Sequence, residues 1–413
     1  MDKNVLIVGG GIIGLTTAYY LDEAGHRVTI IDRRDFLSNC STGNAGLIVP
    51  SHFVPLASPG IVRQGIKWIF DSKSPFSMNF KPDFKLVKWG ISFWRASNRE
   101  NVRKSGPVLF SLSSFSKELY KSLLQSPEIN ADYQERGLLM LCHSSGKADE
   151  EANVGLEANR LGIRAEVLNP EQIKEILPHV EFNVSGGVYY PSDASIFPKK
   201  FLESLIKKLK SKNVELLSSH TLLDLQFSGN KASKALTDKG NIEFDELVIA
   251  GGVQSQKIFN KLKISTLIQA GKGYSFDCNP VEHLDIPLIL VDARVAVTPF
   301  DHTTRFAGAM EIGGIEKIIK KKKIEGMVES INKFMPQIGM KYPATETIWS
   351  GLRPCSVDGL PYIGRLKKYN NVIVATGHSM MGVSLAPATG KLVEELISGK
   401  KTSLDLEPFY PER

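Results

Sequence analysis

The sequence predicts an α/β protein of two domains, one built around a βαβ unit and the other of mixed α+β character. Two observations support this fold class. Residues 4–32 read as strand, helix and strand, with glycines between the first strand and the helix. Apolar, β-branched runs that end in glycine then recur much later in the chain. A length of 413 residues leaves room for both domains.

The N-terminal unit begins with a short apolar run from Asn4 to Val8, which predicts a buried strand. Residues Ile12 to Ala24 follow with helical character, and Gly25 is a residue that commonly ends a helix. The run from Arg27 to Asp32 is β-branched and predicts a second strand. Three such elements in about 30 residues have the size of one βαβ unit.

Later segments repeat this alternation of strands and helices. The expected elements are a helix over Phe201 to Lys210, a strand over Val214 to Ser218, hairpins between Leu222 and Phe244, strands over Leu247 to Gly252 and Asn371 to Gly377, and a helix over Pro387 to Ile397. Strands are also expected over Ala293 to Phe300 and Thr304 to Ala309. We therefore expect a discontinuous βαβ domain from residues 1–50, 192–262 and 345–413, and a second domain from 51–191 and 263–344.

The segment from Trp349 to Gly364 contains three glycines and two prolines, so it is expected to be mostly turns. Asp358 and Gly359 form a natural turn pair within it. One arginine, Arg353, lies between Leu352 and Pro354. A permanent cation in so short a turn-rich passage suggests a binding role, because functional residues are common on loops.

Glycines between the first strand and the first helix fit the pattern G-x-G-x-x-G, from Gly9 to Gly14. In a Rossmann-like unit they allow a tight turn, close approach of the backbone to a pyrophosphate, and close packing of helix on strand. The first N–H groups of the helix then face the phosphates. Asp32 follows at the end of the second strand, where a carboxylate accepts hydrogen bonds from a ribose. Together these features predict a dinucleotide site.

The glycine pattern alone does not distinguish NAD from FAD. Its position at the N-terminus, together with strand–glycine elements at Ala250 to Gly252 and Ala375 to Gly377, favours FAD. A long cofactor that stays bound through the reaction must be lined by several separated segments, whereas NAD enzymes usually complete their site within one contiguous domain.

Composition and charge exclude several classes of protein. No run of about 18 apolar residues predicts a spanning helix, and the N-terminus lacks the features of a signal peptide, so we expect a cytoplasmic protein. Four cysteines lie far apart without a C-x-x-C pair, which predicts neither a metal site nor a disulfide framework. The net charge of +7 is concentrated in Lys207 to Lys212 and Lys317 to Glu325. Without interleaved aromatic residues, these runs indicate solvated helix faces and no nucleic-acid partner.

Several segments together resemble the D-amino-acid-oxidase superfamily of FAD-dependent amine and amino-acid oxidoreductases, and within it the bacterial D-amino acid dehydrogenases. The matching segments are the N-terminal glycines, Asn44 to Gly46, Gly186 to Asp193, Gly271 to Ser275, Gly351 to Pro354, Asp358 to Gly364, Gly377 to Gly382, and Leu385 to Gly390. They span almost the whole chain.

The resemblance implies a Rossmann-like FAD-binding domain and a substrate domain whose antiparallel sheet covers the flavin. It also implies non-covalent FAD, a D-amino acid substrate, and hydride transfer from Cα–H to flavin N5, followed by hydrolysis of the imino acid. Cyclic substrates such as D-proline or hydroxy-D-proline, and a quinone or other non-oxygen electron acceptor, fit this expectation. The expected cofactor-binding residues are Gly9, Gly11, Ile12, Ile13, Gly14, Asp32, Arg33, Asn44, Ala45, Gly46, Gly251, Gly252, Gly377, His378 and Gly382.

Three residues are candidates for contact with the substrate. The resemblance implies that Arg353 binds the carboxylate through its bidentate guanidinium; the alternatives are an ion pair with a core carboxylate or stacking on Trp349. Tyr274 either shares the carboxylate or is a half-buried sheet aromatic. His52 either faces the flavin or the substrate amine, or is structural. For a fourth residue, Arg305, an ion pair with Glu311 is favoured over a place in the pocket.

Two further segments bear on specificity and location. In glycine oxidases the segment that matches Gly377 to Gly382 carries a second substrate-binding arginine, whereas this chain has Met380, which favours a larger or more apolar substrate. The segment from Ile61 to Trp94 interleaves aromatic residues with lysines. Core packing and a lid over the active site are favoured for it. The alternative is a surface that places the protein on the inner face of the cell membrane.

The sequence leaves two rival functions. One is an oxidase of the glycine or sarcosine type, which passes its electrons to oxygen. The other is a flavin-binding or basic nucleic-acid-binding protein without redox turnover, which predicts salt-sensitive binding to nucleic acid.

Overall fold

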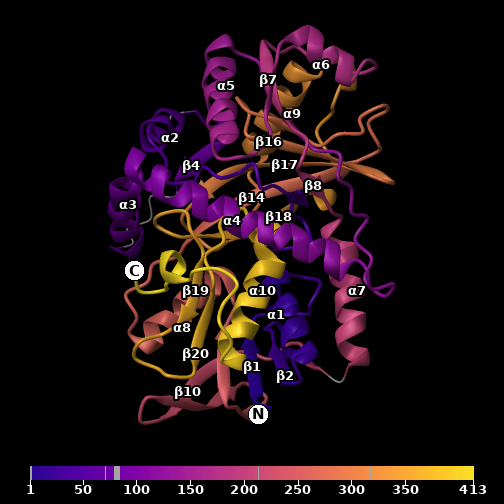
Figure 1. The fold of residues 1–413 in the computed structure, drawn as a ribbon. Helices are drawn as coiled ribbons and strands as arrows, with labels where there is room; N and C mark the ends of the chain where they lie inside the picture. The colour runs from indigo at the N-terminus through magenta and orange to yellow at the C-terminus, as the bar shows by residue number, and fades with distance from the viewer. Residues whose placement is uncertain (1, 70, 79–83, 213, 317) are drawn as a thin grey trace.

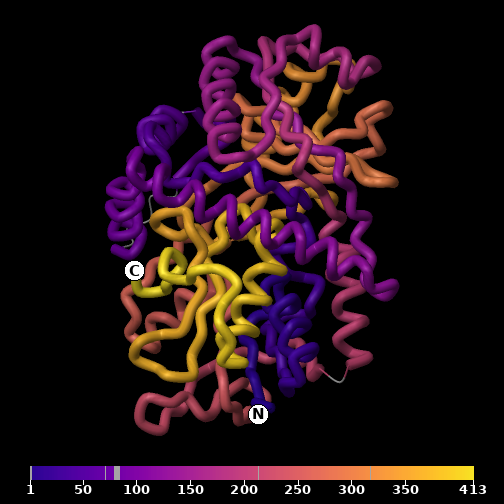
Figure 2. The backbone as a smooth tube through the Cα atoms, in the orientation of Figure 1, coloured from indigo at the N-terminus to yellow at the C-terminus, as the bar shows by residue number. Residues whose placement is uncertain are grey.

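The computed structural model describes residues 2–69, 71–78, 84–212, 214–316 and 318–413. Two sheets dominate it, with a six-stranded sheet in the lower half of Figure 1 and a nine-stranded sheet in the upper half. Helix α4 (Arg99–Leu123) crosses the molecule between them. Figure 2 shows the first and last parts of the chain side by side, because the C-terminal helix α10 (Gly382–Ser398) packs against α1 (Ile12–Glu23).

The six-stranded sheet has the order β19-β20-β13-β1-β2-β9. Its members are β1 (Asn4–Val8), β2 (Arg27–Ile31), β9 (Glu215–Leu217), β13 (Glu246–Ile249), β19 (Tyr362–Arg365) and β20 (Val372–Thr376). All neighbours are parallel except β19 and β20. Parallel strands place their carboxyl ends along one edge, which is where such sheets bind ligands.

The nine-stranded sheet has the order β18-β14-β17-β16-β15-β5-β7-β6, with β4 beside β17. Its members are β4 (Phe76–Met78), β5 (Leu138–Cys142), β6 (Glu166–Leu168), β7 (Gly186–Tyr190), β14 (Gln269–Cys278), β15 (Leu288–Leu290), β16 (Val295–Phe300), β17 (Thr303–Ile312) and β18 (Trp349–Cys355). Its long central strands are antiparallel. The expected α/β fold with an antiparallel second sheet is therefore confirmed.

The remaining elements surround these sheets. They are β3 (Leu47–Ile48) paired with β8 (Ala194–Ser195), the hairpin strands β10 (Leu222–Ser228), β11 (Lys231–Thr237) and β12 (Gly240–Glu243), and the helices α2 (Ile61–Ile69), α3 (Phe84–Ala96), α5 (Ser145–Arg160), α6 (Pro170–Ile176), α7 (Pro198–Ser211), α8 (Ser255–Leu262) and α9 (Lys321–Phe334). One large apolar core joins the six-stranded sheet to α1, α7 and α10, and another joins the nine-stranded sheet to α9. In the described part of the chain, no helix is long and apolar enough to cross a membrane.

Most predicted strands and helices are present within a few residues of their expected ends. The start of the last helix was predicted wrongly, because α10 begins at Gly382 and carries Pro387 inside it. A proline there cannot donate to the carbonyl four residues earlier. The Tyr120 hydroxyl donates to that carbonyl, Val383 O, at 2.7 Å, so a residue of α4 satisfies the acceptor that the proline leaves open.

The expectation that Trp349 to Gly364 is mostly turns is also wrong, since its first seven residues form β18. Strand β18 lies at the edge of its sheet, so no strand on its outer side requires the N–H donor that Pro354 lacks. The turn occupies the next residues, including Gly359 with a φ of +91°, and leads into β19 of the other sheet. The strand therefore belongs to the nine-stranded sheet, although it lies within the range 345–413 assigned to the βαβ domain.

The second lysine-rich stretch differs from a fully solvated helix face. Helix α9 begins at Lys321, and Lys317 lies outside the described residues. Lys323 is buried, and its Nζ donates to Ser74 O at 2.8 Å and to Phe76 O at 3.1 Å. A buried ammonium must be hydrogen-bonded, and these backbone acceptors lie in or just before β4. Lys323 therefore links α9 to that strand.

Candidate active site

The loop between β1 and α1 is as tight as the glycine pattern predicts. Gly9 has a φ of +122°, and a Cβ there would lie 2.5 Å from Ala250 O. A Cβ on Gly14 would lie 1.9 Å from Gly9 O. The helix therefore packs directly on the strand. Gly11 caps α1 without a side chain, and the first turn of the helix, which includes Ile12 and Ile13, has no acidic residue.

Asp32 lies at the carboxyl end of β2 and braces this loop. Its Oδ2 accepts the Gly10 N–H at 2.7 Å, and its Oδ1 accepts the Arg34 N–H at 2.9 Å. The side chain is only partly buried, so the carboxylate remains open to a ribose hydroxyl. Its neighbour Arg33 is exposed. At the start of α1, the Ile12 N–H donates to Ser41 Oγ at 3.2 Å. The tight loop, the N-terminus of the helix and the acid fit the pyrophosphate and ribose of a dinucleotide.

The segment after β2 is held in a fixed shape beside this loop. Asn44 Oδ1 accepts the Gly46 N–H at 2.8 Å, and Gly46 has a φ of +78°. Ala45 lines the cavity described below. Arg305 Nη1 donates to Asn44 O at 2.9 Å and to Thr42 O at 3.0 Å, so a residue of the other sheet fixes the backbone of this segment.

The expected ion pair between Arg305 and Glu311 is wrong. Arg305 Nε and Nη2 donate to the two carboxylate oxygens of Asp277, at 2.7 and 2.9 Å. Asp277 is the cross-strand partner of Arg305 in the pairing of β14 with β17. Glu311 lies further along the same strand, about 20 Å away at about 3.3 Å per residue, which is too far for an ion pair.

Two further glycine segments lie at the same edge of the six-stranded sheet. Gly251 and Gly252 follow β13, and Gly252 has a φ of +55°. Gly377 follows β20 with a φ of +82°, and a Cβ there would lie 2.7 Å from Tyr362 Cδ2. Gly382 opens α10. The predicted cofactor-binding segments are therefore brought together by the carboxyl ends of β1, β13 and β20.

His378 is turned into the protein. It is buried, and its Nε2 lies 2.9 Å from Thr389 Oγ1. The Thr389 hydroxyl donates to Leu385 O at 2.9 Å, so the histidine ring donates to it. Burial lowers the pKa of His378 to about 3, so the ring is neutral. These contacts give it a packing role at the start of α10.

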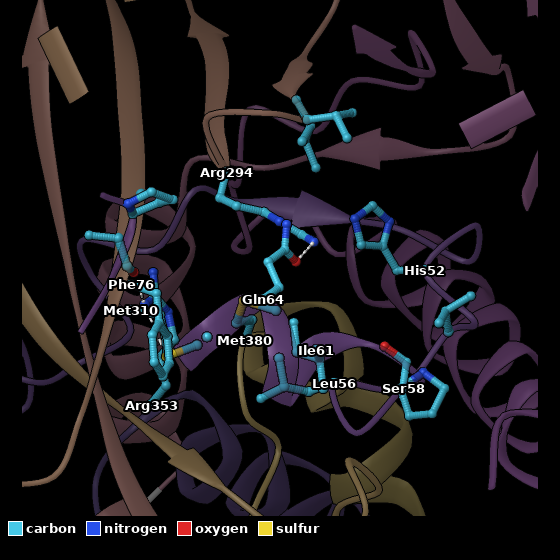
Figure 3. Close-up of a pocket in the computed structure, with 18 of the residues that line it drawn as sticks. His52, Leu56, Ser58, Ile61, Gln64, Phe76, Arg294, Met310, Arg353 and Met380 are labelled. Atoms are coloured by element: carbon cyan, nitrogen blue, oxygen red, sulfur yellow. Dashed lines mark hydrogen bonds between the residues drawn. The ribbon is translucent and has the colours of Figure 1, made fainter. Parts of the chain in front are cut away.

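A cavity of about 1330 Å³ is lined by strands of the nine-stranded sheet and by helices and loops packed beside them. Its walls come from residues 40–69, from β14, β17 and β18, and from Met380 and Met381 beside α10. Figure 3 shows Phe76, Met310 and Arg353 on the left with Met380 beside them, Arg294 and Gln64 in the middle, and His52 on the right. Met380 is 45% exposed and supplies apolar surface at this place.

Arg353 projects from β18 into the cavity. Its Nη1 donates to Ala309 O at 2.7 Å, and Ala309 adopts a φ of +59° that is unusual for a residue with a Cβ. A Cβ on Gly273 would lie 2.2 Å from Nη1, so the guanidinium occupies the space that this glycine leaves open. Among the described residues it forms no ion pair with a carboxylate. Burial lowers the pKa of Arg353 from its usual value.

Tyr274 has its hydroxyl engaged elsewhere. The ring contributes to the cavity wall, but the O–H donates to Glu311 and accepts the Lys320 N–H at 3.2 Å. Lys272 Nζ lies 3.3 Å from the same carboxylate, which also pairs with the side chain of Lys320. Burial, followed by the Glu311 contact, raises the pKa of Tyr274, so the phenol stays protonated. Tyr274 and Arg353 are therefore brought to one cavity, but the hydroxyl faces a different group.

His52 lies on the opposite wall. Its Nδ1 is 3.2 Å from Ser51 Oγ, and burial, together with nearby Arg294, lowers its pKa to about 4. Arg294 was missed by the sequence analysis. It lies in the turn between β15 and β16 with a φ of +54°, and its Nη2 donates to Gln64 Oε1 at 3.4 Å. No sequence signal singled it out, because Arg294 falls within the strand predicted over Ala293 to Phe300, whereas β16 begins only at Val295.

Comparison with known proteins agrees with this architecture. Residues 4–396 match the family described as FAD dependent oxidoreductase. The chain belongs to this family. The enzyme is 29% identical over 398 residues to the D-amino acid dehydrogenase of Helicobacter pylori, covering 96% of this chain and 95% of that protein. It is 30% identical over 415 residues to that of Neisseria gonorrhoeae, covering 97% and 96%.

Solved structures share the fold across the whole chain. Glycine oxidase from Geobacillus kaustophilus superposes with a TM-score of 0.81 at 21% identity, covering 100% of this enzyme and 99% of that chain. L-proline dehydrogenase from P. horikoshii superposes with a TM-score of 0.73 at 20% identity, covering 100% and 97%. The enzyme is therefore an FAD-dependent oxidoreductase, and its glycine loop, Asp32 and the edge of the six-stranded sheet are suited to hold the cofactor.

Proposed function

We propose that this enzyme is a D-amino acid dehydrogenase in which Arg353 binds the carboxylate of the substrate. The observation that carries the proposal is a guanidinium in the cavity wall without a carboxylate partner among the described residues. Arginine forms two parallel hydrogen bonds with a carboxylate, which fixes both the position and the orientation of the substrate. The names of the relatives at 29 to 30% identity support a D-amino acid.

The residues of this chain mainly position the substrate. FAD, when bound, supplies the acceptor for the hydride that leaves the substrate Cα, and water then hydrolyses the imino acid. Arg353 holds the carboxylate, and the ring of Tyr274 limits the space beside it. His52 faces the cavity as a neutral imidazole and is suited to contact the amine. Positioning of this kind accounts for much of enzymatic rate enhancement.

The cavity favours a substrate with an apolar or cyclic side chain. Phe76, Met310 and Met380 surround the space next to Arg353. Met380 presents a flexible thioether, which adapts to irregular apolar groups. D-proline and hydroxy-D-proline have a compact ring of this character, and glycine has no side chain to fill the space.

We also propose that a quinone accepts the electrons and that α3 brings the enzyme to a membrane surface. Phe84, Val87, Ile91 and Trp94 follow helical spacing and are 83%, 57%, 47% and 63% exposed. The opposite face of α3 is buried, so this helix packs on the protein with one apolar face and exposes another. Basic residues flank the exposed row, as in helices that bind anionic lipid. Phe70 and Phe80 of the same segment lie outside the described residues.

Flavin absorbance provides the test of substrate and acceptor. A panel of D-amino acids is mixed anaerobically with the holoenzyme, and bleaching of the flavin identifies substrates. Arg353→Ala should weaken substrate binding by about 10²–10³-fold, because a desolvated charge partner is lost. Unchanged affinity in that variant would refute the anchor role. Subsequent mixing with oxygen or a quinone analogue separates a dehydrogenase from an oxidase of the glycine or sarcosine type.

Flotation with vesicles tests the membrane surface. The wild-type holoenzyme should float with vesicles of phosphatidylcholine and phosphatidylglycerol, and Trp94→Glu should remain in the soluble fraction. Leu223→Glu is a matched control, because Leu223 is also an exposed apolar residue, at 50%, but lies on β10 far from α3 in the chain. Equal flotation of the Trp94 and Leu223 variants would exclude α3 as the contact.

A further inference from the structure

A fully buried carboxylate lies behind the cavity wall. Asp193, between β7 and β8, is 0% exposed, and it forms no ion pair among the residues that the structure describes. Its Oδ1 accepts the Ser51 N–H at 3.2 Å, and its Oδ2 accepts the Ser51 hydroxyl. The nearest cation, Lys117 on α4, is engaged by Ser192 O at 2.6 Å and by Glu135. Burial raises the pKa of Asp193 to about 7.

Ser51 connects this carboxylate to the cavity. Its Oγ lies 3.2 Å from Nδ1 of His52, and the His52 ring stands in the cavity wall facing Arg294 and Gln64 (Figure 3). A serine hydroxyl has one hydrogen, so it donates to only one of its two neighbours. The direction of that single hydrogen therefore sets the tautomer of His52.

Two arrangements satisfy every partner. With Asp193 ionised, Ser51 donates to the carboxylate and accepts from His52 Nδ1–H, so that Nε2 is an unprotonated acceptor. With Asp193 protonated, the carboxyl donates to Ser51, Ser51 donates to Nδ1, and Nε2 carries the hydrogen. The two arrangements differ by one proton and leave the imidazole neutral in both.

We propose that His52, Ser51 and Asp193 form a relay that removes one proton from the ammonium group of the substrate and stores it on the buried carboxylate. The N–H bond of the ammonium breaks as His52 Nε2–H forms. The Nδ1–H bond breaks as a new Ser51 O–H forms, and the original Ser51 hydrogen moves to Asp193. The ammonium becomes a neutral amine and the carboxylate a neutral acid, so charge and atoms balance.

The relay rests on the proposed function and explains a step that it requires. A hydride leaves Cα readily only when the nitrogen lone pair is free, so the amine must be unprotonated. His52 alone is a poor base here, because burial and the Arg294 cation lower its pKa to about 4. Passing the proton onward avoids a second cation beside that arginine. His52 touches the substrate, and Ser51 and Asp193 are positioning residues that act through it.

Other titratable groups face the relay and must be separated from it. Glu151 on α5 lies near Arg294, and burial raises its pKa to about 7 as well. Burial, followed by the negative charges of Glu151 and Asp193, raises the pKa of Tyr190 on β7 far above neutrality. The phenol therefore stays protonated. Lys117 and Arg294 are the cations on either side of the relay. Glu151 is thus the second carboxyl that titrates near pH 7, and Glu151→Gln is the matched control.

Nitrogen NMR of the holoenzyme with ¹⁵N-histidine, without substrate, tests the coupling. The His52 signal is assigned by its loss in His52→Gln. In the wild type, Nε2 should change from protonated to unprotonated as the pH rises from 5.5 to 8.5. In Asp193→Asn, the amide nitrogen takes the place of Oδ2 and donates to Ser51, so Nε2 should stay protonated at all pH values. Glu151→Gln should behave as the wild type. If the protonation of His52 Nε2 in the wild type does not change between pH 5.5 and 8.5, the relay is refuted.

Anaerobic flavin reduction provides the second readout. At pH 7, Asp193→Asn and Ser51→Ala should reduce the flavin about 10²-fold more slowly than the wild type, and their rates should rise with pH until the free amine predominates. Affinity for a carboxylate without an amino group should be unchanged in both. A wild-type pH profile in Asp193→Asn overturns the relay. If no amino acid reduces the flavin of the wild type, the proposed function is refuted instead. The NMR measurement of the His52 tautomer still decides whether Asp193 and His52 are coupled.

Discussion

Gly273→Ala should weaken substrate binding although this residue has no side chain to contact the substrate. A Cβ at this position would lie 2.2 Å from Arg353 Nη1 and 2.3 Å from its Cζ. Ordinary contacts between such atoms are about 3.5 Å, so the guanidinium must move by more than about 1 Å. Gly273 has no positive φ, and alanine is therefore compatible with the strand itself. The effect should act through the arginine alone.

The size of the effect follows from that displacement. A misplacement of about 1 Å at a binding group costs about 10²-fold, or about 3 kcal/mol. The assay titrates the holoenzyme with a simple carboxylate such as benzoate and follows the flavin absorbance. Flavin content per protein, measured first, controls for damage to the cofactor site.

A double-mutant cycle decides whether the arginine carries the effect. In the Arg353→Ala background the guanidinium is absent, so Gly273→Ala should change the dissociation constant by less than about twofold. If Gly273→Ala is as damaging in that background as in the wild type, the clash with Arg353 is not the cause and the reasoning fails.

Three further predictions concern the cofactor loop, α10 and the buried acid. Gly14→Ala should abolish FAD retention, because its Cβ would lie 1.9 Å from Gly9 O; an unchanged flavin absorbance per protein would contradict this. Tyr120→Phe removes the donor to Val383 O and should lower the free energy of unfolding by about 1–3 kcal/mol, measured by urea titration. Asp193 has a folded pKa of about 7, above its unfolded value, so the folded state binds more protons between about pH 4 and 7 and stability falls as pH rises through that range. Asp193→Asn should flatten this fall, by up to about 4 kcal/mol between pH 4 and 8; equal slopes for both proteins would contradict the raised pKa.

The glycine loop was predictable from the sequence because its determinants are local. Gly9 to Gly14, the flanking strands and Asp32 all belong to the first strand–helix–strand unit, and steric limits on the backbone fix their arrangement. The segment around Arg353 was less predictable. Its glycines and Pro354 indicate turns, but pairing with β14 at the edge of the sheet outweighs that local preference.

The wall opposite Arg353 depends on contacts that no local pattern reveals. Arg294 reaches the cavity because a hairpin turn with a positive φ aims it there. Asp193 meets Ser51 because β3 pairs with β8, although the two strands lie far apart in the chain. The partner of Arg305 likewise follows from cross-strand register, which cannot be read from a single strand.

The position of β1 also has a consequence for biosynthesis. Its neighbours in the sheet are β2, made immediately after it, and β13, made only when more than half of the chain has been synthesised. Strand β20, Gly377 and helix α10 complete the same edge only after translation has passed Val372. A nascent chain therefore displays the glycine loop long before the rest of this edge exists. We therefore expect a chain terminated before Val372 to retain no FAD and to be colourless.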